Sequence, residues 1–161
     1  MRVGIFDSGI GGLTVLKNLY HHYPNNEYIY FGDTLNLPYG NKTKDDLNKL
    51  AHKDVEFLIS KNVDLIIIAC GTVSSNCYTY LKEHFNIPIY DIISPTINYI
   101  NNSEFKNIGI IATNATINSH IFKSDINKEV YEINTPDFVP IIENNNYSIL
   151  NDTIDNYLKD Y

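Results

Sequence analysis

The stretch from Leu65 to Cys77, LIIIACGTVSSNC, decides how the rest of the chain is interpreted. It opens with an apolar, β-branched run over residues 65–69, which is typical of a strand buried on both faces of a parallel sheet. Cys70 comes directly after this run, and a Ser-rich segment that can begin a helix follows it. Open α/β sheets bind ligands at this position, and a helix amino terminus favours a thiolate over a thiol. The stretch alone leaves two interpretations of Cys70 open, a reactive thiol or a small core residue.

The composition is that of a globular chain without a nucleic-acid or membrane partner. The 161 residues are 43% hydrophobic and carry a formal net charge of −7. This acidity, without any basic block, argues against a nucleic-acid binder. No apolar run approaches the roughly 18 residues of a membrane span, and Met1-Arg2 leads directly into a strand instead of a signal peptide. We therefore expect a cytoplasmic protein.

The two cysteines do not predict a disulfide framework or a metal site. Cys70 and Cys77 do not form a CxxC pair, and their separation is not a usual zinc spacing. Cys77 lies inside an expected helix, which favours a structural role for it. We expect no metal ligands here.

Strands and helices alternate along the chain, which predicts an α/β fold with a mostly parallel sheet flanked by helices. Thr43 is placed to cap the clearest helix, with Asp46 three residues on. The polar segment 101–107 is the expected crossing between a first domain, 1–97, and a second domain, 98–161. Strands are expected at 2–6, 28–31, 65–69, 87–93, 108–112 and 130–133, and helices from 13, at 43–62, at 71–85, from 94 and from 149 to 158.

Loops rich in glycine or hydroxyl groups follow several of these strands. The first, DSGIGG at 7–12, lacks the GxGxxG pattern of dinucleotide sites and the GK[ST] of phosphate loops. Its glycines allow backbone N–H groups to approach a ligand closely, so a binding site is favoured over a bare turn. A Pro-Tyr-Gly turn at 38–40 and a Thr-rich loop at 113–116 occupy similar places after other strands.

In combination these motifs resemble glutamate racemases, of the cofactor-independent aspartate/glutamate racemase superfamily. The resemblance implies two similar Rossmann-like domains, of which the second is incomplete in this sequence. It also implies two cysteines on opposite faces of the α-carbon, with no metal, pyridoxal phosphate or nucleotide cofactor. The motifs that carry it are FDSGIGG at 6–12, YFGDT at 30–34, PYG at 38–40, ACGT at 69–72, IAT at 111–113 with Thr116, and VPIIE at 139–143.

The resemblance also implies roles for individual residues. Cys70 would be one acid–base thiol, Asp7 would assist its proton transfers or hold the substrate ammonium, and Glu143 matches a carboxylate on the side of the second cysteine. The implied reaction interconverts L- and D-glutamate for peptidoglycan. The implied substrate contacts are Asp7, Ser8, Pro38, Tyr39, Gly40, Cys70, Gly71, Thr72, Thr113 and Thr116.

Three departures from the family pattern keep other interpretations open. Gly71 stands where the family usually has Asn, Thr135 stands where Cys is common, and the second catalytic motif, GCTHYP, does not occur in these residues. We therefore expect this chain to racemise weakly or not at all. The alternatives are a non-catalytic ligand-binding or remnant protein, an aspartate racemase, or a small nucleotide- or phosphate-binding module. An incomplete domain would expose strand edges, which leaves a homodimer open.

Overall fold

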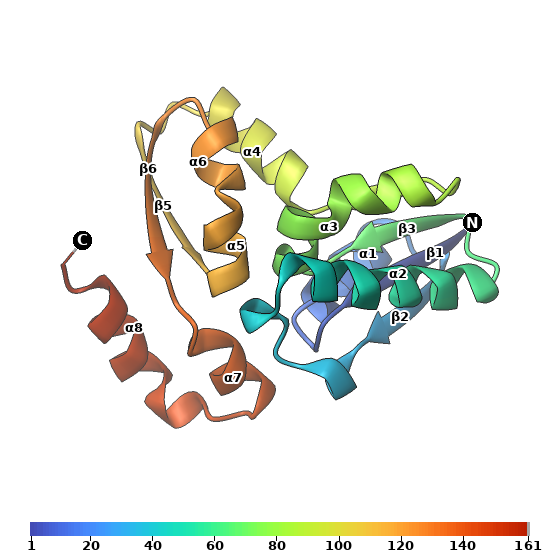
Figure 1. Ribbon diagram of the computed structural model, residues 1–161, viewed down its shortest axis with the longest axis horizontal. Coiled ribbons are helices and arrows are strands. Elements are labelled where there is room, and N and C mark those ends of the chain that lie inside the picture. The colour runs from blue at the N-terminus through green and yellow to red at the C-terminus, as the bar shows by residue number, and fades with distance from the viewer. Residues whose placement is uncertain (161) are drawn as a thin grey trace.

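Two parallel sheets organise the chain, and they confirm the expected α/β class. A computed structural model describes residues 1–160. The first sheet has the order β2-β1-β3-β4, the second pairs β5 with β6, and every pair described is parallel. Figure 1 shows α4 running from the first sheet to the second. The strands are β1 (Arg2–Asp7), β2 (Glu27–Gly32), β3 (Leu65–Ile68), β4 (Ile89–Asp91), β5 (Asn107–Ala112) and β6 (Glu129–Asn134).

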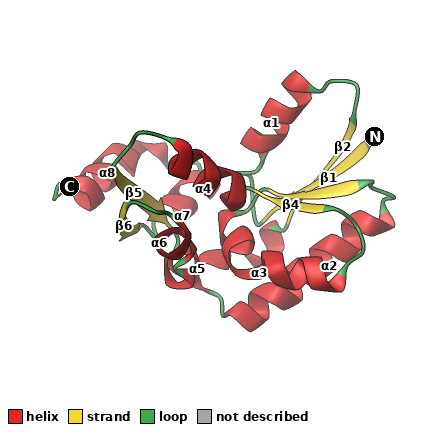
Figure 2. Ribbon diagram, turned by 90° about the horizontal axis from the view of Figure 1, so that it is seen from above, coloured by secondary structure: helices red, strands yellow, loops and turns green. Residues whose placement is uncertain are grey.

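Helices cover both faces of the first sheet, as the uninterrupted apolar strands require. Figure 2 shows α1 on one face and α2 and α3 on the other. In β1, Val3 and Ile5 pack on the α1 side, and Phe6 packs with α2 and α3. The helices are α1 (Leu13–His22), α2 (Lys44–Ser60), α3 (Gly71–His84), α4 (Ile93–Asn102), α5 (Asn114–Ser119), α6 (Ile121–Asp125), α7 (Phe138–Glu143) and α8 (Leu150–Leu158), with 3-10 turns η1 (Thr34–Asn36), η2 (Tyr39–Asn41) and η3 (Tyr147–Ile149).

The expected elements are present, with shifted ends and three additional short helices. Thr43 caps α2 as predicted, and its hydroxyl accepts the Asp46 N–H at 3.2 Å. The strand expected at 87–93 ends at Asp91, because the Asp91 carboxylate accepts the N–H groups of Ile93 and Ser94 and starts α4. The short helices α5, α6 and α7 were not expected, and the expected domain boundary after residue 97 falls inside α4. Within residues 1–160, no helix is both long and apolar enough to cross a bilayer.

Candidate active site

A cavity of about 400 Å³ lies at the carboxyl ends of strands from both sheets. Asp7 reaches it from the end of β1, Cys70 from the end of β3, and Thr113 from the end of β5. Most of the residues expected to form a site line this cavity: Asp7, Ser8, Cys70, Gly71, Thr72, Thr113, Thr116 and Glu143. Its apolar wall, which the sequence analysis did not anticipate, includes Ile92, Ile93, Ile111, Phe122, Phe138, Val139 and Ile142.

Among the described residues, 1–160, Cys70 supplies the one sulfur that lines the cavity, and it is a buried thiol. It precedes the first residue of α3, is 4% exposed, and its Sγ donates to Ser8 Oγ at 3.5 Å. Burial, together with the negative charge of Asp7, raises the pKa of Cys70 to about 11. Hydrogen bonds from Ser8 and from the backbone at the start of α3 lower this pKa but do not outweigh burial. With this pKa, Cys70 is a thiol at neutral pH and not the thiolate that its position before a helix favours.

Two carboxylates accept hydrogen bonds from the backbone of the glycine loop that follows β1. Asp7 Oδ2 accepts the Gly12 N–H at 2.9 Å, and Glu143 Oε1 accepts the Ile10 N–H at 2.9 Å. A side chain at position 9 would collide with Glu143, because a Cβ there would lie 2.0 Å from its Oε1. The loop thus brings a carboxylate from the end of β1 and one from α7 to the same cavity.

Tyr30 supports this loop from β2, a role that the sequence analysis did not assign. Its Oη donates to the Gly9 carbonyl at 2.7 Å. Burial raises the pKa of Tyr30, and the nearby Asp7, Glu143 and Cys70 raise it further. The phenol therefore stays neutral and holds the loop in place as a hydrogen-bond donor.

Hydroxyl groups join the two sides of the cavity through α3 and α5. Thr72 Oγ1 and Thr113 Oγ1 lie 2.9 Å apart, and Thr113 Oγ1 lies 3.2 Å from Thr116 Oγ1. Asn76, a further residue missed from the sequence, donates from Nδ2 to the Ala115 carbonyl at 3.1 Å. The cavity wall is therefore lined with hydroxyls that are already positioned by one another.

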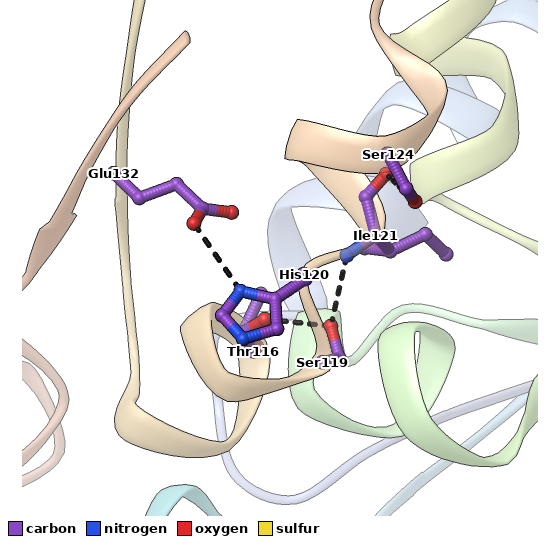
Figure 3. A network of polar contacts seen from close by, with 6 residues as sticks. All are labelled: Thr116, Ser119, His120, Ile121, Ser124 and Glu132. Atoms are coloured by element: carbon purple, nitrogen blue, oxygen red, sulfur yellow. Dashed lines mark hydrogen bonds and ion pairs between the residues drawn. The ribbon is translucent and has the colours of Figure 1, made fainter.

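Polar contacts next to Thr116 stabilise the turn between α5 and α6 (Figure 3). Ser119 Oγ donates to the Thr116 carbonyl at 2.6 Å, and His120 Nδ1 lies 3.6 Å from Glu132 Oε2 of β6. Among residues 1–160, the second oxygen of Glu132, Oε1, is buried without a hydrogen-bond partner. His120 adopts a left-handed backbone conformation, with φ of 55°, which separates the two short helices.

The Pro-Tyr-Gly turn lies behind the cavity and does not line it. Tyr39 is 1% exposed, and its hydroxyl contacts Asp33 and Asp54. Gly40 lies against Thr113, since an added Cβ would be 2.7 Å from the Thr113 Cβ. Direct substrate contact by Pro38, Tyr39 and Gly40 stays a prediction. Cys77 is fully buried in α3 and is not among the cavity residues.

The charge of the cavity indicates the kind of ligand that it can hold. In the described part of the chain, its lining contains the carboxylates of Asp7 and Glu143 but no Lys, Arg or His. These carboxylates suit an ammonium group, whereas the hydroxyls and the amino-terminal end of α3 suit a ligand carboxylate. Residues 1–160 hold no cluster of three or more His, Cys, Asp or Glu side chains arranged for a metal ion.

Comparison with known proteins gives consistent relatives. No family model matches the chain. It is 41% identical to glutamate racemase of Hydrogenobaculum sp. (strain Y04AAS1), over all of this chain and 64% of that protein. It is 43% identical to glutamate racemase of Fusobacterium nucleatum, over 88% of this chain and 56% of that protein. The chain thus spans less than two thirds of the length of these relatives.

Solved structures agree with the sequence relatives. Glutamate racemase of Francisella tularensis, crystallised in complex with D-glutamate, matches 98% of this chain and 62% of its own, with 39% identity and a TM-score of 0.90. Glutamate racemase of Campylobacter jejuni matches all of this chain and 68% of its own, with 33% identity and a TM-score of 0.88. On these similarities of sequence and fold, the chain belongs to the glutamate racemase family.

Proposed function

We propose that this chain binds glutamate in the cavity and supplies one of the two proton-transfer groups of a glutamate racemase. The observation that carries the proposal is the Cys70 thiol, which shares one cavity with the carboxylates of Asp7 and Glu143. The names of the relatives and the D-glutamate in the Francisella tularensis structure support glutamate as the ligand. D-Glutamate made in this way would serve peptidoglycan synthesis in the cytoplasm.

The substrate itself supplies the positive charge that Cys70 lacks. A substrate ammonium group beside Cys70 would offset the negative charge of Asp7, which raises the pKa of Cys70. The thiol proton would then pass to Asp7, and the thiolate would take the α-proton of glutamate. The resulting carbanion needs donors already in place, and the hydroxyls of Thr72 and Thr113, which line the cavity 2.9 Å apart, would supply them.

Racemisation needs a second acid on the opposite face of the α-carbon. Cys77 does not serve, because it is fully buried in α3 and absent from the cavity lining. For a polypeptide of these 161 residues we therefore propose exchange of the α-proton on one face with little or no net racemisation.

Proton NMR of L- and D-glutamate in deuterated water tests the proposal. One enantiomer should lose its α-proton signal, while circular dichroism of the same sample stays nearly constant. Cys70→Ser should abolish the exchange, and Cys77→Ser, as the matched control, should retain it. Full racemisation by this chain would refute the single-thiol account, and exchange that survives Cys70→Ser would refute the role of Cys70.

Non-catalytic binding is the second candidate, and the protonated Cys70 favours it. A binding protein would show a calorimetric signal with glutamate but no α-proton exchange with either enantiomer. Aspartate belongs in the same titrations, because it differs from glutamate by one methylene and separates the two racemase activities.

A further inference from the structure

A buried group of three side chains lies behind the cavity, beneath residues 38–41. Asp33 follows β2, Tyr39 begins η2, and Asp54 lies on α2. They are 6%, 1% and 4% exposed, respectively, and none of them lines the cavity. The mechanism proposed above does not use them, so their arrangement needs its own explanation.

The hydrogen bonds of this group require one proton more than Tyr39 provides. Tyr39 Oη lies 2.6 Å from Asp33 Oδ2 and 3.1 Å from Asp54 Oδ2. The shorter distance assigns the phenol proton to Asp33, whose carboxylate also accepts from Asn36 Nδ2 at 3.0 and 2.8 Å. The phenol has a single proton, so once that proton goes to Asp33, the 3.1 Å contact with Asp54 is a full hydrogen bond only if Asp54 carries a proton of its own.

We propose that the Asp54 carboxyl holds its proton to a much higher pH than an exposed aspartate does and donates it to the phenol oxygen of Tyr39. Asp54 is then a positioning residue, which acts on the cavity through Tyr39 and residues 38–41 without touching the ligand.

The contacts of residues 38–41 connect this group to the cavity. The Gly40 backbone lies against Thr113, and Asn114 Nδ2 donates to Asn41 Oδ1 at 2.8 Å. Thr113 in turn lies 2.9 Å from Thr72 across the cavity. A shift of Tyr39 would therefore move the threonine that joins the two sides of the site.

The surroundings of Asp54 favour the protonated form. Burial, and next the charge of Asp33, raise the pKa of Asp54 to about 7, and only donation from the Tyr39 hydroxyl to Asp54 would act in the opposite direction. Titratable groups on the neighbouring elements are engaged elsewhere. On the α3 side, the rings of Tyr80 and His84 pack against that of His52. The charged groups that affect the pKa of Cys77 are Lys44 and Cys70. Tyr28 and Tyr30 of β2 pack on the α1 side of the sheet, and Asp7 of β1 accepts a hydrogen bond from the glycine loop.

Loss of this proton to solvent at higher pH would place two carboxylates around one phenol. Between about pH 4 and 7 the folded chain binds the Asp54 proton and the unfolded chain does not. The stability that this proton contributes is therefore complete below pH 4 and is lost as the pH rises through 7. Residues 38–41 should loosen over the same range.

Carbon NMR of the full chain, labelled at the aspartate carboxyls, tests the proton directly. One aspartate should titrate near pH 7, and this signal should vanish in Asp54→Asn. The amide signals of residues 38–41 and of Thr113 should shift with the same midpoint. In Asp54→Asn, whose amide donates permanently, they should stay at their low-pH positions throughout.

Asp45→Asn is the matched control, since Asp45 is exposed on the same helix and its replacement should leave the midpoint unchanged. The wild-type titration tests for the proton on Asp54 even if Asp54→Asn folds poorly. An Asp54 midpoint near 4 would overturn the proposal, as would amide shifts that persist unchanged in Asp54→Asn. These readouts need no ligand, so they are independent of the proposed racemase function.

Discussion

Cys70 shows how one residue can be well placed for chemistry and still be inactive at rest. Its position at the start of α3 favours a thiolate, yet burial and Asp7 raise its pKa to about 11. The outcome depends on how deeply the sulfur is buried and on what lies beside it, and neither is visible in the order of residues. The motif around Cys70 predicted a residue that lines the cavity, but the ionisation of that residue required the structure.

Alkylation of Cys70 should follow this pKa. In a Cys77→Ala background, the rate of reaction with iodoacetamide should rise about tenfold per pH unit between pH 7 and 10, because only the thiolate reacts. Mass spectrometry of the modified chain measures the rate, and the Cys70→Ala variant gives the background. A rate already at its plateau at pH 7 would mean that the resting residue is a thiolate.

Replacement by alanine should change stability differently at two glycines, one that lines the cavity and one that lies behind it. Gly71→Ala should leave the free energy of unfolding unchanged or slightly higher, because nothing lies within 4 Å of the added Cβ. Gly40→Ala should cost about 1–3 kcal/mol, since its Cβ would meet Thr113 at 2.7 Å. Urea unfolding compares the two variants. Equal costs would show that residues 38–41 do not press on Thr113.

At the scale of elements, long periodic segments were predictable and short ones were not. The apolar period of α2 and its Thr43 cap were evident in the sequence. The helices α5 and α6 have six and five residues, too few to show a period. Contacts between elements were also hidden: Thr72 and Thr113 are 41 positions apart, and only the packing of α3 on α5 brings them together.

The cap of α2 gives a test at this scale. Thr43→Ala should lower the free energy of unfolding by about 1 kcal/mol, because the Asp46 N–H loses its side-chain acceptor. Thr43→Ser keeps the hydroxyl and should lose much less. Urea unfolding measures both. An identical loss in the two variants would indicate that the methyl group, and not the cap, stabilises the helix.

The molecule as a whole is more completely packed around its first sheet than around its second. Both faces of the first sheet are covered, whereas Tyr131 of β6 is 43% exposed on the second sheet. Apolar side chains on an open sheet surface favour contacts between molecules. Whether such contacts produce a defined homodimer stays a prediction.

Sedimentation velocity over a range of concentrations tests this surface. The chain should sediment faster as concentration rises, and Tyr131→Lys should reduce the effect. Leu35→Ser is the control, because Leu35 is 91% exposed in η1, away from the second sheet. If Tyr131→Lys and Leu35→Ser behave alike, the second sheet is not the surface that associates.

None of the described residues around the cavity is basic, and this has a consequence for inhibitors. Glutarate has the carbon chain of glutamate and both acid groups but no amine, so nothing in it compensates Asp7 and Glu143. It should compete about 10- to 100-fold less well than glutamate, the span expected for one lost hydrogen bond to a charged group. A useful competitor would therefore need a cationic nitrogen before it needs a second acid.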